Sequence, residues 1–92
     1  MFTTDSPVDL RFMVWASPII QDVRGHRRIK WVDTDTLDGS RSGTLRGYIT
    51  DGGDDIRNAI VRVTLDSGWE HEVSLVTLMN ASHRGGYTHR DA

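Results

Sequence analysis

Residues Asn58–Leu78 read NAIVRVTLDSGWEHEVSLVTL, and this stretch decides the fold because it predicts a β-hairpin. Apolar and polar side chains alternate along Ala59–Leu65 and again along Trp69–Leu75, which is the pattern of half-buried strands. The two runs are separated by Asp66-Ser67-Gly68. A loop of this length with glycine last is typical of a turn that ends in a left-handed bulge residue.

The loop length sets a register in which mostly apolar residues face one another: Leu65 with Trp69, Val63 with His71, Val61 with Val73, and Ala59 with Leu75. The other face pairs Arg62 with Glu72, an opposite-charge pair worth roughly 0.2–1 kcal/mol. A slip of one residue would exchange the buried and the solvated faces, so this register is favoured. It predicts that Trp69 packs in the core.

The composition predicts one small domain over residues 1–82, followed by a flexible tail over residues 83–92. The chain has no cysteine, which excludes a disulfide or thiolate–zinc framework. Its net charge of −2 provides no bulk attraction to nucleic acid or to an anionic membrane. Neither a membrane-spanning run nor a signal peptide is evident, so we expect a cytoplasmic protein without a membrane partner.

The N-terminal region, residues 8–23, is expected to pack on this domain as an extension. Val8–Trp15 alternates and predicts a strand, with a helix as the alternative, and Pro18 predicts a bend after it. A second hairpin is expected to turn at Arg24-Gly25-His26. Leu45–Asp51 predicts a further strand, and Thr77–Asn80 predicts a tight helical turn and a last short strand.

The segment VRVTLDSGWEHEVSLVTL, residues 61–78, resembles the end of Src-homology-3-like small barrels, the class that includes Tudor and KOW modules. The resemblance also covers the order of strands and turns from about Gly25 to Met79. It implies an all-β fold: a small barrel of about five short antiparallel strands, here with an extra N-terminal strand. Because this fold carries many unrelated functions, the resemblance alone implies no activity.

Several chemical motifs are incomplete, so we expect no enzyme, no cofactor and no metal. The run Asp33–Gly39 resembles a calcium loop, but its third acid is displaced by one residue and Thr44 stands where the final glutamate belongs. In Glu70-His71-Glu72, a strand would point His71 away from both carboxylates. Gly52-Gly53 lacks the lysine of a phosphate loop, and the chain has no recognisable nucleophile with its base.

The strongest charge feature is Arg24–Trp31, RGHRRIKW, which places basic residues beside an aromatic ring. The leading hypothesis is a non-catalytic module that docks on a protein partner, in the style of a bacterial or phage accessory protein or adaptor. The alternative is nucleic-acid binding. Two acidic runs argue against it, because they would repel a phosphate backbone: Asp33–Asp38 and Asp51–Asp55. Free sheet edges would also allow a homodimer. The predicted partner-binding residues are Arg24, His26, Arg27, Arg28, Lys30, Trp31, Arg46 and Tyr48.

Overall fold

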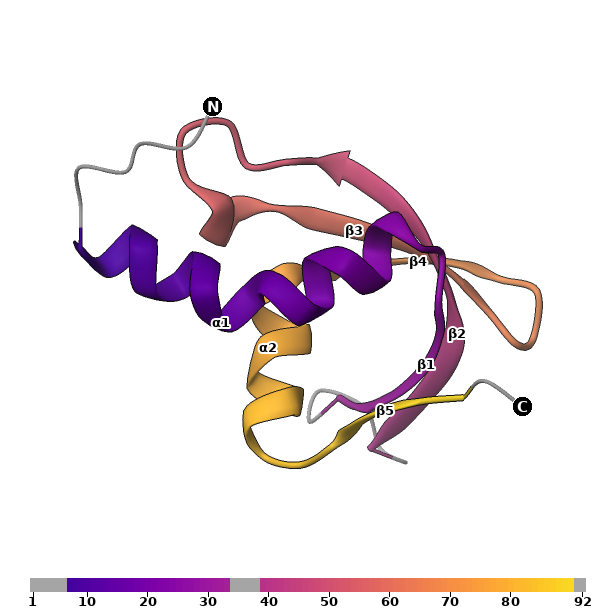
Figure 1. Ribbon diagram of the computed structural model, residues 1–92. Coiled ribbons are helices and arrows are strands. Elements are labelled where there is room, and N and C mark those ends of the chain that lie inside the picture. The colour runs from indigo at the N-terminus through magenta and orange to yellow at the C-terminus, as the bar shows by residue number, and fades with distance from the viewer. Residues whose placement is uncertain (1–6, 34–38, 91–92) are drawn as a thin grey trace.

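The computed structural model describes residues 7–33 and 39–90 and consists of one antiparallel sheet with two α-helices (Figure 1). The sheet order is β4-β3-β2-β1-β5. Along the chain the elements are α1 (Pro7–Arg24), β1 (Arg28–Val32), β2 (Ser40–Thr50), the short 3-10 helix η1 (Ile56–Asn58), β3 (Ile60–Leu65), β4 (Glu70–Ser74), α2 (Leu75–His83) and β5 (Tyr87–His89).

The predicted hairpin is confirmed as β3 and β4, in the predicted register. Val63 pairs with His71, Arg62 with Glu72, and Val61 with Val73. Gly68 has φ of 95°, the left-handed conformation expected at the end of the turn. The expectation that Trp69 is buried is wrong, since 75% of its surface is exposed. The loop end of the hairpin extends beyond both helices (Figure 1), so Trp69 lies outside the part of the sheet that the helices cover.

Strand β2 is longer than the predicted Leu45–Asp51 and links the two halves of the sheet. Its first residues pair with β1, and its residues from Gly43 onward pair with β3. The pairing with β3 shifts twice, between Leu45 and Gly47 and between Tyr48 and Thr50. Such irregularities bend a strand, and they let β2 curl around the core. At Gly43 the strands approach closely, because a Cβ there would lie 2.6 Å from the carbonyl oxygen of Thr64.

The predicted N-terminal strand is wrong, because Val8–Trp15 lies within helix α1. The residues that α1 packs into the core, Ala16, Ile19, Ile20 and Val23, have helical spacing. The predicted hairpin turn at Arg24-Gly25-His26 is instead the end of this helix. The N–H of Gly25 donates to the carbonyl of Gln21 at 2.9 Å, and His26, with φ of 51°, redirects the chain into β1.

Helix α2 extends the predicted helical turn and occupies the place of the predicted last short strand, so that strand prediction is wrong. The sheet is open, so the predicted closed barrel is not formed. The hydroxyl of Ser74 caps α2 by accepting a bond from the N–H of Thr77 at 3.0 Å. Buried side chains of both helices join one cluster with the inward side chains of the sheet, so both helices cover the same face. The five antiparallel strands are confirmed, but β4 and β5 remain two free edges of an open sheet.

In the described part of the chain, neither helix is long and apolar enough to cross a membrane.

The predicted flexible tail is wrong in its described part, because Tyr87–His89 forms β5 and pairs with β1. A buried carboxylate anchors this strand to α1. Asp22, only 5% exposed, accepts a hydrogen bond from the Tyr87 hydroxyl at 2.8 Å, and its Oδ2 lies 2.7 Å from Nε2 of His89. These contacts join residues more than sixty positions apart in the chain, a distance over which sequence patterns carry no signal.

Candidate docking surface

Strand β1 presents a basic face to solvent and an apolar face to the core. Arg28 and Lys30 are exposed, and they alternate with buried Ile29 and Trp31. Trp31 is fully buried and its ring stacks on His71, with centroids 6.2 Å apart, so its predicted place on a binding surface is wrong. We call Arg28 and Lys30 the β1 basic pair, and their side of the sheet the outer face.

The neighbours of the β1 basic pair are mostly hydroxyl groups. Arg28 lies between Thr44 of β2 and the basic residue Arg90, which follows β5. Lys30 lies opposite Ser42 on one side and Thr88 on the other. Within residues 7–33 and 39–90, neither member of the pair forms an ion pair. In this part of the chain neither cation pairs directly with a carboxylate, while the N–H of Asp66 donates to the carbonyl of Ser42, the neighbour of Lys30.

The other basic side chains of the outer face have polar or acidic partners: Arg46 with Thr64, Arg62 opposite Glu72, and Arg90 with Asp66. Nε of Arg46 donates to the Thr64 hydroxyl at 3.1 Å, and that hydroxyl donates to Glu70 at 2.9 Å. On the outer face, the β1 basic pair has no carboxylate partner of its own in the described residues, whereas Glu70 and Glu72 lie on β4 and Asp66 pairs with Arg90.

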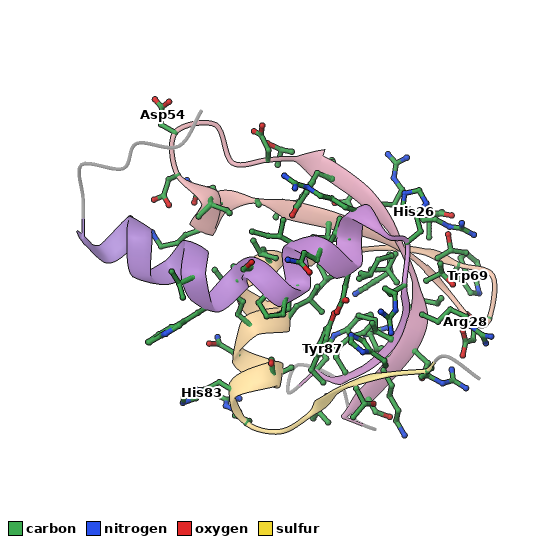
Figure 2. All side chains as sticks on the ribbon, in the orientation of Figure 1. His26, Arg28, Asp54, Trp69, His83 and Tyr87 are labelled. Carbon is green, nitrogen blue, oxygen red and sulfur yellow. The ribbon has the colours of Figure 1, made fainter. Side chains whose placement is uncertain are left out.

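An exposed aromatic ring lies at the same end of the molecule as the basic pair. Arg28 is the first residue of β1 and pairs with Thr44 of β2. Thr44 pairs with Thr64 of β3, which in turn pairs with Glu70 of β4, the residue that follows Trp69. Figure 2 shows His26, Arg28 and Trp69 projecting at this end. The sequence analysis assigned Trp69 to the core from strand alternation alone. Its position beside the hairpin loop was the signal that the core would not reach it.

The remaining predicted binding residues divide between two sides of the sheet. Arg24 and His26 are exposed at the end of α1, whereas Arg27 is half-buried. Tyr48 is 37% exposed and pairs with buried Val61, so it lies on the side of the helices. Burial raises the pKa of Tyr48, and the nearby charge of Arg24 partly offsets this. Arg46 lies on the outer face. The predicted set is therefore not one continuous surface.

In the described residues, the histidine and carboxylate motifs do not gather into a metal-binding cluster. His71 points to the opposite face from Glu70 and Glu72, as the strand pattern predicted. Burial, and secondarily the charge of Arg41, lowers the pKa of His71. No three histidine, aspartate or glutamate side chains of this part of the chain gather to hold a metal. Of the predicted calcium loop, residues 34–38 lie outside the described residues, and Asp33 is buried 3.6 Å from Nε of Arg41.

Two surface hollows lie away from the β1 basic pair. One, of about 630 Å³, lies over β2, β3 and β4 and is lined by Arg46, Arg62, Thr64, Glu70, His71 and Glu72. The other, of about 530 Å³, lies between α1 and α2 and is lined by Trp15, Met79, Asn80, Ser82 and His83. The Trp15 side chain is 69% exposed.

Comparison with protein-family models, with curated proteins and with solved structures finds no match for this chain.

Proposed function

We propose that this chain is a non-catalytic binding module that docks on an acidic surface of a protein partner through the β1 basic pair. The observation that carries the proposal is that Arg28 and Lys30 are exposed side by side among hydroxyl groups and Arg90, without an ion pair in the described residues. Arg90 is already paired with Asp66, whereas Arg28 and Lys30 have no carboxylate partner in the described residues, so an incoming carboxylate is stabilised at this pair. Such complementarity accelerates association and selects the partner.

Trp69 is exposed at the same end of the molecule and would supply the apolar part of a contact that extends around this end of the sheet. Tryptophan and arginine are enriched among the residues that dominate protein–protein binding energy. An exposed indole at the rim of a basic patch can bury its ring against the partner while the cations pair with carboxylates. This combination supports a protein partner more than a small molecule, because the hollows of about 630, 530 and 340 Å³ are not lined by Arg28, Lys30 or Trp69.

The same chemistry supports nucleic-acid binding as a second candidate. Cations with hydroxyl neighbours can contact phosphates, and an exposed indole can stack on a base. Carboxylates on the same outer face, Asp66, Glu70 and Glu72, would repel a long phosphate backbone. We therefore place the protein partner first.

We also propose that the fold is an opened relative of the Src-homology-3-like small barrel. The support is the strand order, a meander from β1 to β4 with β5 returning to the free side of β1. A barrel of these strands would need β4 to meet β5. Helix α2 connects those two strands and packs under the sheet in this chain.

The test compares binding of two fluorescent probes, a polyglutamate peptide and a mixed-sequence single-stranded oligonucleotide, by anisotropy over a range of salt concentrations. We expect polyglutamate to bind, and the variant Arg28→Gln/Lys30→Gln to lose roughly tenfold in affinity, about 1.4 kcal/mol. Binding should weaken with salt, since the pair is exposed. The matched control Arg57→Gln/Arg62→Gln removes the same charge elsewhere and should bind like the wild type.

The contradicting outcomes are distinct. Equal loss in both double variants would show that only net charge matters, and would overturn a defined docking surface. Oligonucleotide binding that exceeds polyglutamate binding, with a salt slope that falls by roughly 0.7 for each cation removed, would establish the nucleic-acid candidate instead.

A further inference from the structure

We propose that the free edge of β4 is a second binding site, which takes an extended peptide segment with basic residues at alternate positions. The site lies on the acidic part of the outer face, away from the β1 basic pair, and the proposal goes beyond the docking function above. It rests on the backbone of the edge strand, on the charge of its side chains and on the hollow beside it.

The backbone of β4 has hydrogen-bonding groups directed at its free side. The N–H of Leu65 donates to the carbonyl of Trp69 at 2.8 Å, and the N–H of Leu75 donates to the carbonyl of Ala59 at 3.0 Å. Bonded and non-bonded pairs alternate along an antiparallel ladder, so the N–H and C=O groups of Glu70 and Glu72 point away from β3. In the part of the chain that the structure describes, β4 pairs with β3 alone.

The charges of the edge select a basic segment. Glu70 and Glu72 are exposed, lie on the same face of β4, and line the hollow of about 630 Å³ on the outer face. In an added antiparallel strand, two residues would face them directly, with Cβ atoms about 4.5–5.5 Å away. Arg62 lies one strand farther from the added segment, so the two carboxylates are the nearest charges. Lysine or arginine at both positions therefore fits.

The residue between the two basic ones would lie on the opposite face, beside His71. That side chain is half-buried and stacks on fully buried Trp31. An apolar or β-branched residue fits there, because it would extend the covered surface over the inner face. The site thus requires a basic residue, then an apolar or β-branched one, then a second basic one, in extended conformation.

The same carboxylates disfavour a second copy of this chain at the edge. Pairing of β4 with another β4 in antiparallel orientation would bring glutamate opposite glutamate, which is destabilising. Charged side chains on edge strands commonly prevent such self-pairing. A basic segment converts that repulsion into attraction, so the edge discriminates between the two kinds of strand.

Backbone N–H resonances are the direct test, with a short peptide of alternating lysine and threonine as the probe. We expect its addition to shift the Glu70 and Glu72 amide signals and to slow their hydrogen exchange, since both become bonded. A peptide of the same sequence, N-methylated at alternate residues on its bonding side, should lose these effects, because it retains the charge but lacks the backbone donors. An alternating glutamate and threonine peptide should leave the signals unchanged.

The matched variants separate this site from the docking surface. Glu70→Gln/Glu72→Gln keeps the shape of the edge and should abolish binding of the lysine peptide. The variant Arg28→Gln/Lys30→Gln should bind the lysine peptide like the wild type. Of the two double variants, only this one should lose affinity for the polyglutamate peptide. Equal binding of the methylated and unmethylated peptides would overturn strand addition, and unchanged binding to the glutamine variant would overturn the charge selection.

Discussion

The β3–β4 hairpin and helix α1 contribute to one core but are specified in different ways. In the hairpin, alternation, loop length and the position of Gly68 all predict the same register, and the structure has that register. In α1 the alternation of Val8–Trp15 predicts a strand, whereas the buried residues Ala16, Ile19 and Val23 have helical spacing. Local agreement between independent signals therefore matters more than the strength of any single pattern.

The largest expected effect tests the hairpin side of this comparison. Val63 is fully buried in the centre of β3, so Val63→Asp places an unpaired charge in the core. We expect a loss of several kcal/mol, enough to unfold a domain of this size. Near-ultraviolet circular dichroism would report the loss of fixed tertiary packing.

The neighbouring position on the outer face is the control. Arg62→Asp introduces the same residue opposite Glu72, where it should cost only about 1 kcal/mol because both side chains are exposed. A folded Val63→Asp variant, or an unfolded Arg62→Asp variant, would mean that the two faces of the hairpin are exchanged.

The next effect tests what the sequence patterns missed, the anchoring of β5 to α1. Asp22→Asn replaces the charged acceptor that serves both Tyr87 and His89. Loss of charge-assisted hydrogen bonds in a buried site should lower the free energy of unfolding by about 1–3 kcal/mol. Urea denaturation measures this loss, with the exposed substitution Asp54→Asn as the control. Faster hydrogen exchange at Tyr87–His89 should accompany it, and equal stability of the two variants would contradict the anchor.

A third substitution distinguishes the helix from the predicted strand. Pro18 lies inside α1 with its side chain exposed, and it cannot donate to the carbonyl of Val14. Pro18→Ala should therefore stabilise the protein by on the order of 1 kcal/mol. Thermal unfolding would detect the gain as a higher Tm. A lower Tm would indicate that the proline serves a bend, as the sequence analysis assumed.

The comparison also explains how much of the fold was predictable. β3, β4 and a helical turn within α2 follow from local signals such as alternation and a glycine loop. The start of α2 at Leu75 was not predicted, because the strand pattern was extended through that residue. Strand β5 has only three residues. It forms because it pairs with the free edge of β1 and because Asp22 accepts a hydrogen bond from the Tyr87 hydroxyl. No local pattern encodes that environment, so the segment resembled a tail.

The candidate docking surface was predictable in part. Arg28 and Lys30 are exposed as expected of binding residues, but Trp31, predicted with them, is buried in alternation with them, and no register was predicted for this strand. The importance of the basic pair depends on what lies across the neighbouring strands. Thr44, Ser42 and Thr88 become its neighbours through pairing over long stretches of chain, and this cannot be deduced from charge counts.

The smallest effect concerns the single histidine of the hairpin's inner face. Burial and the charge of Arg41 lower the pKa of His71 below its ordinary 6.5, so the unfolded chain takes up a proton at higher pH than the folded one does. The contribution of neutral His71 to the free energy of unfolding is therefore fully present above pH 6.5, and it decreases as the pH falls below 6.5. His71→Gln should flatten that decrease, whereas His83→Gln, at an exposed site, should not. An unchanged slope in His71→Gln would contradict the assignment.

The most direct test of docking through the outer face of β1 is a titration with polyglutamate peptide followed by amide and indole resonances. We predict that the signals of Arg28–Lys30 and the indole of Trp69 move together. Shifts confined instead to Trp15 and Met79 would place the binding surface between α1 and α2 and would contradict the proposed function.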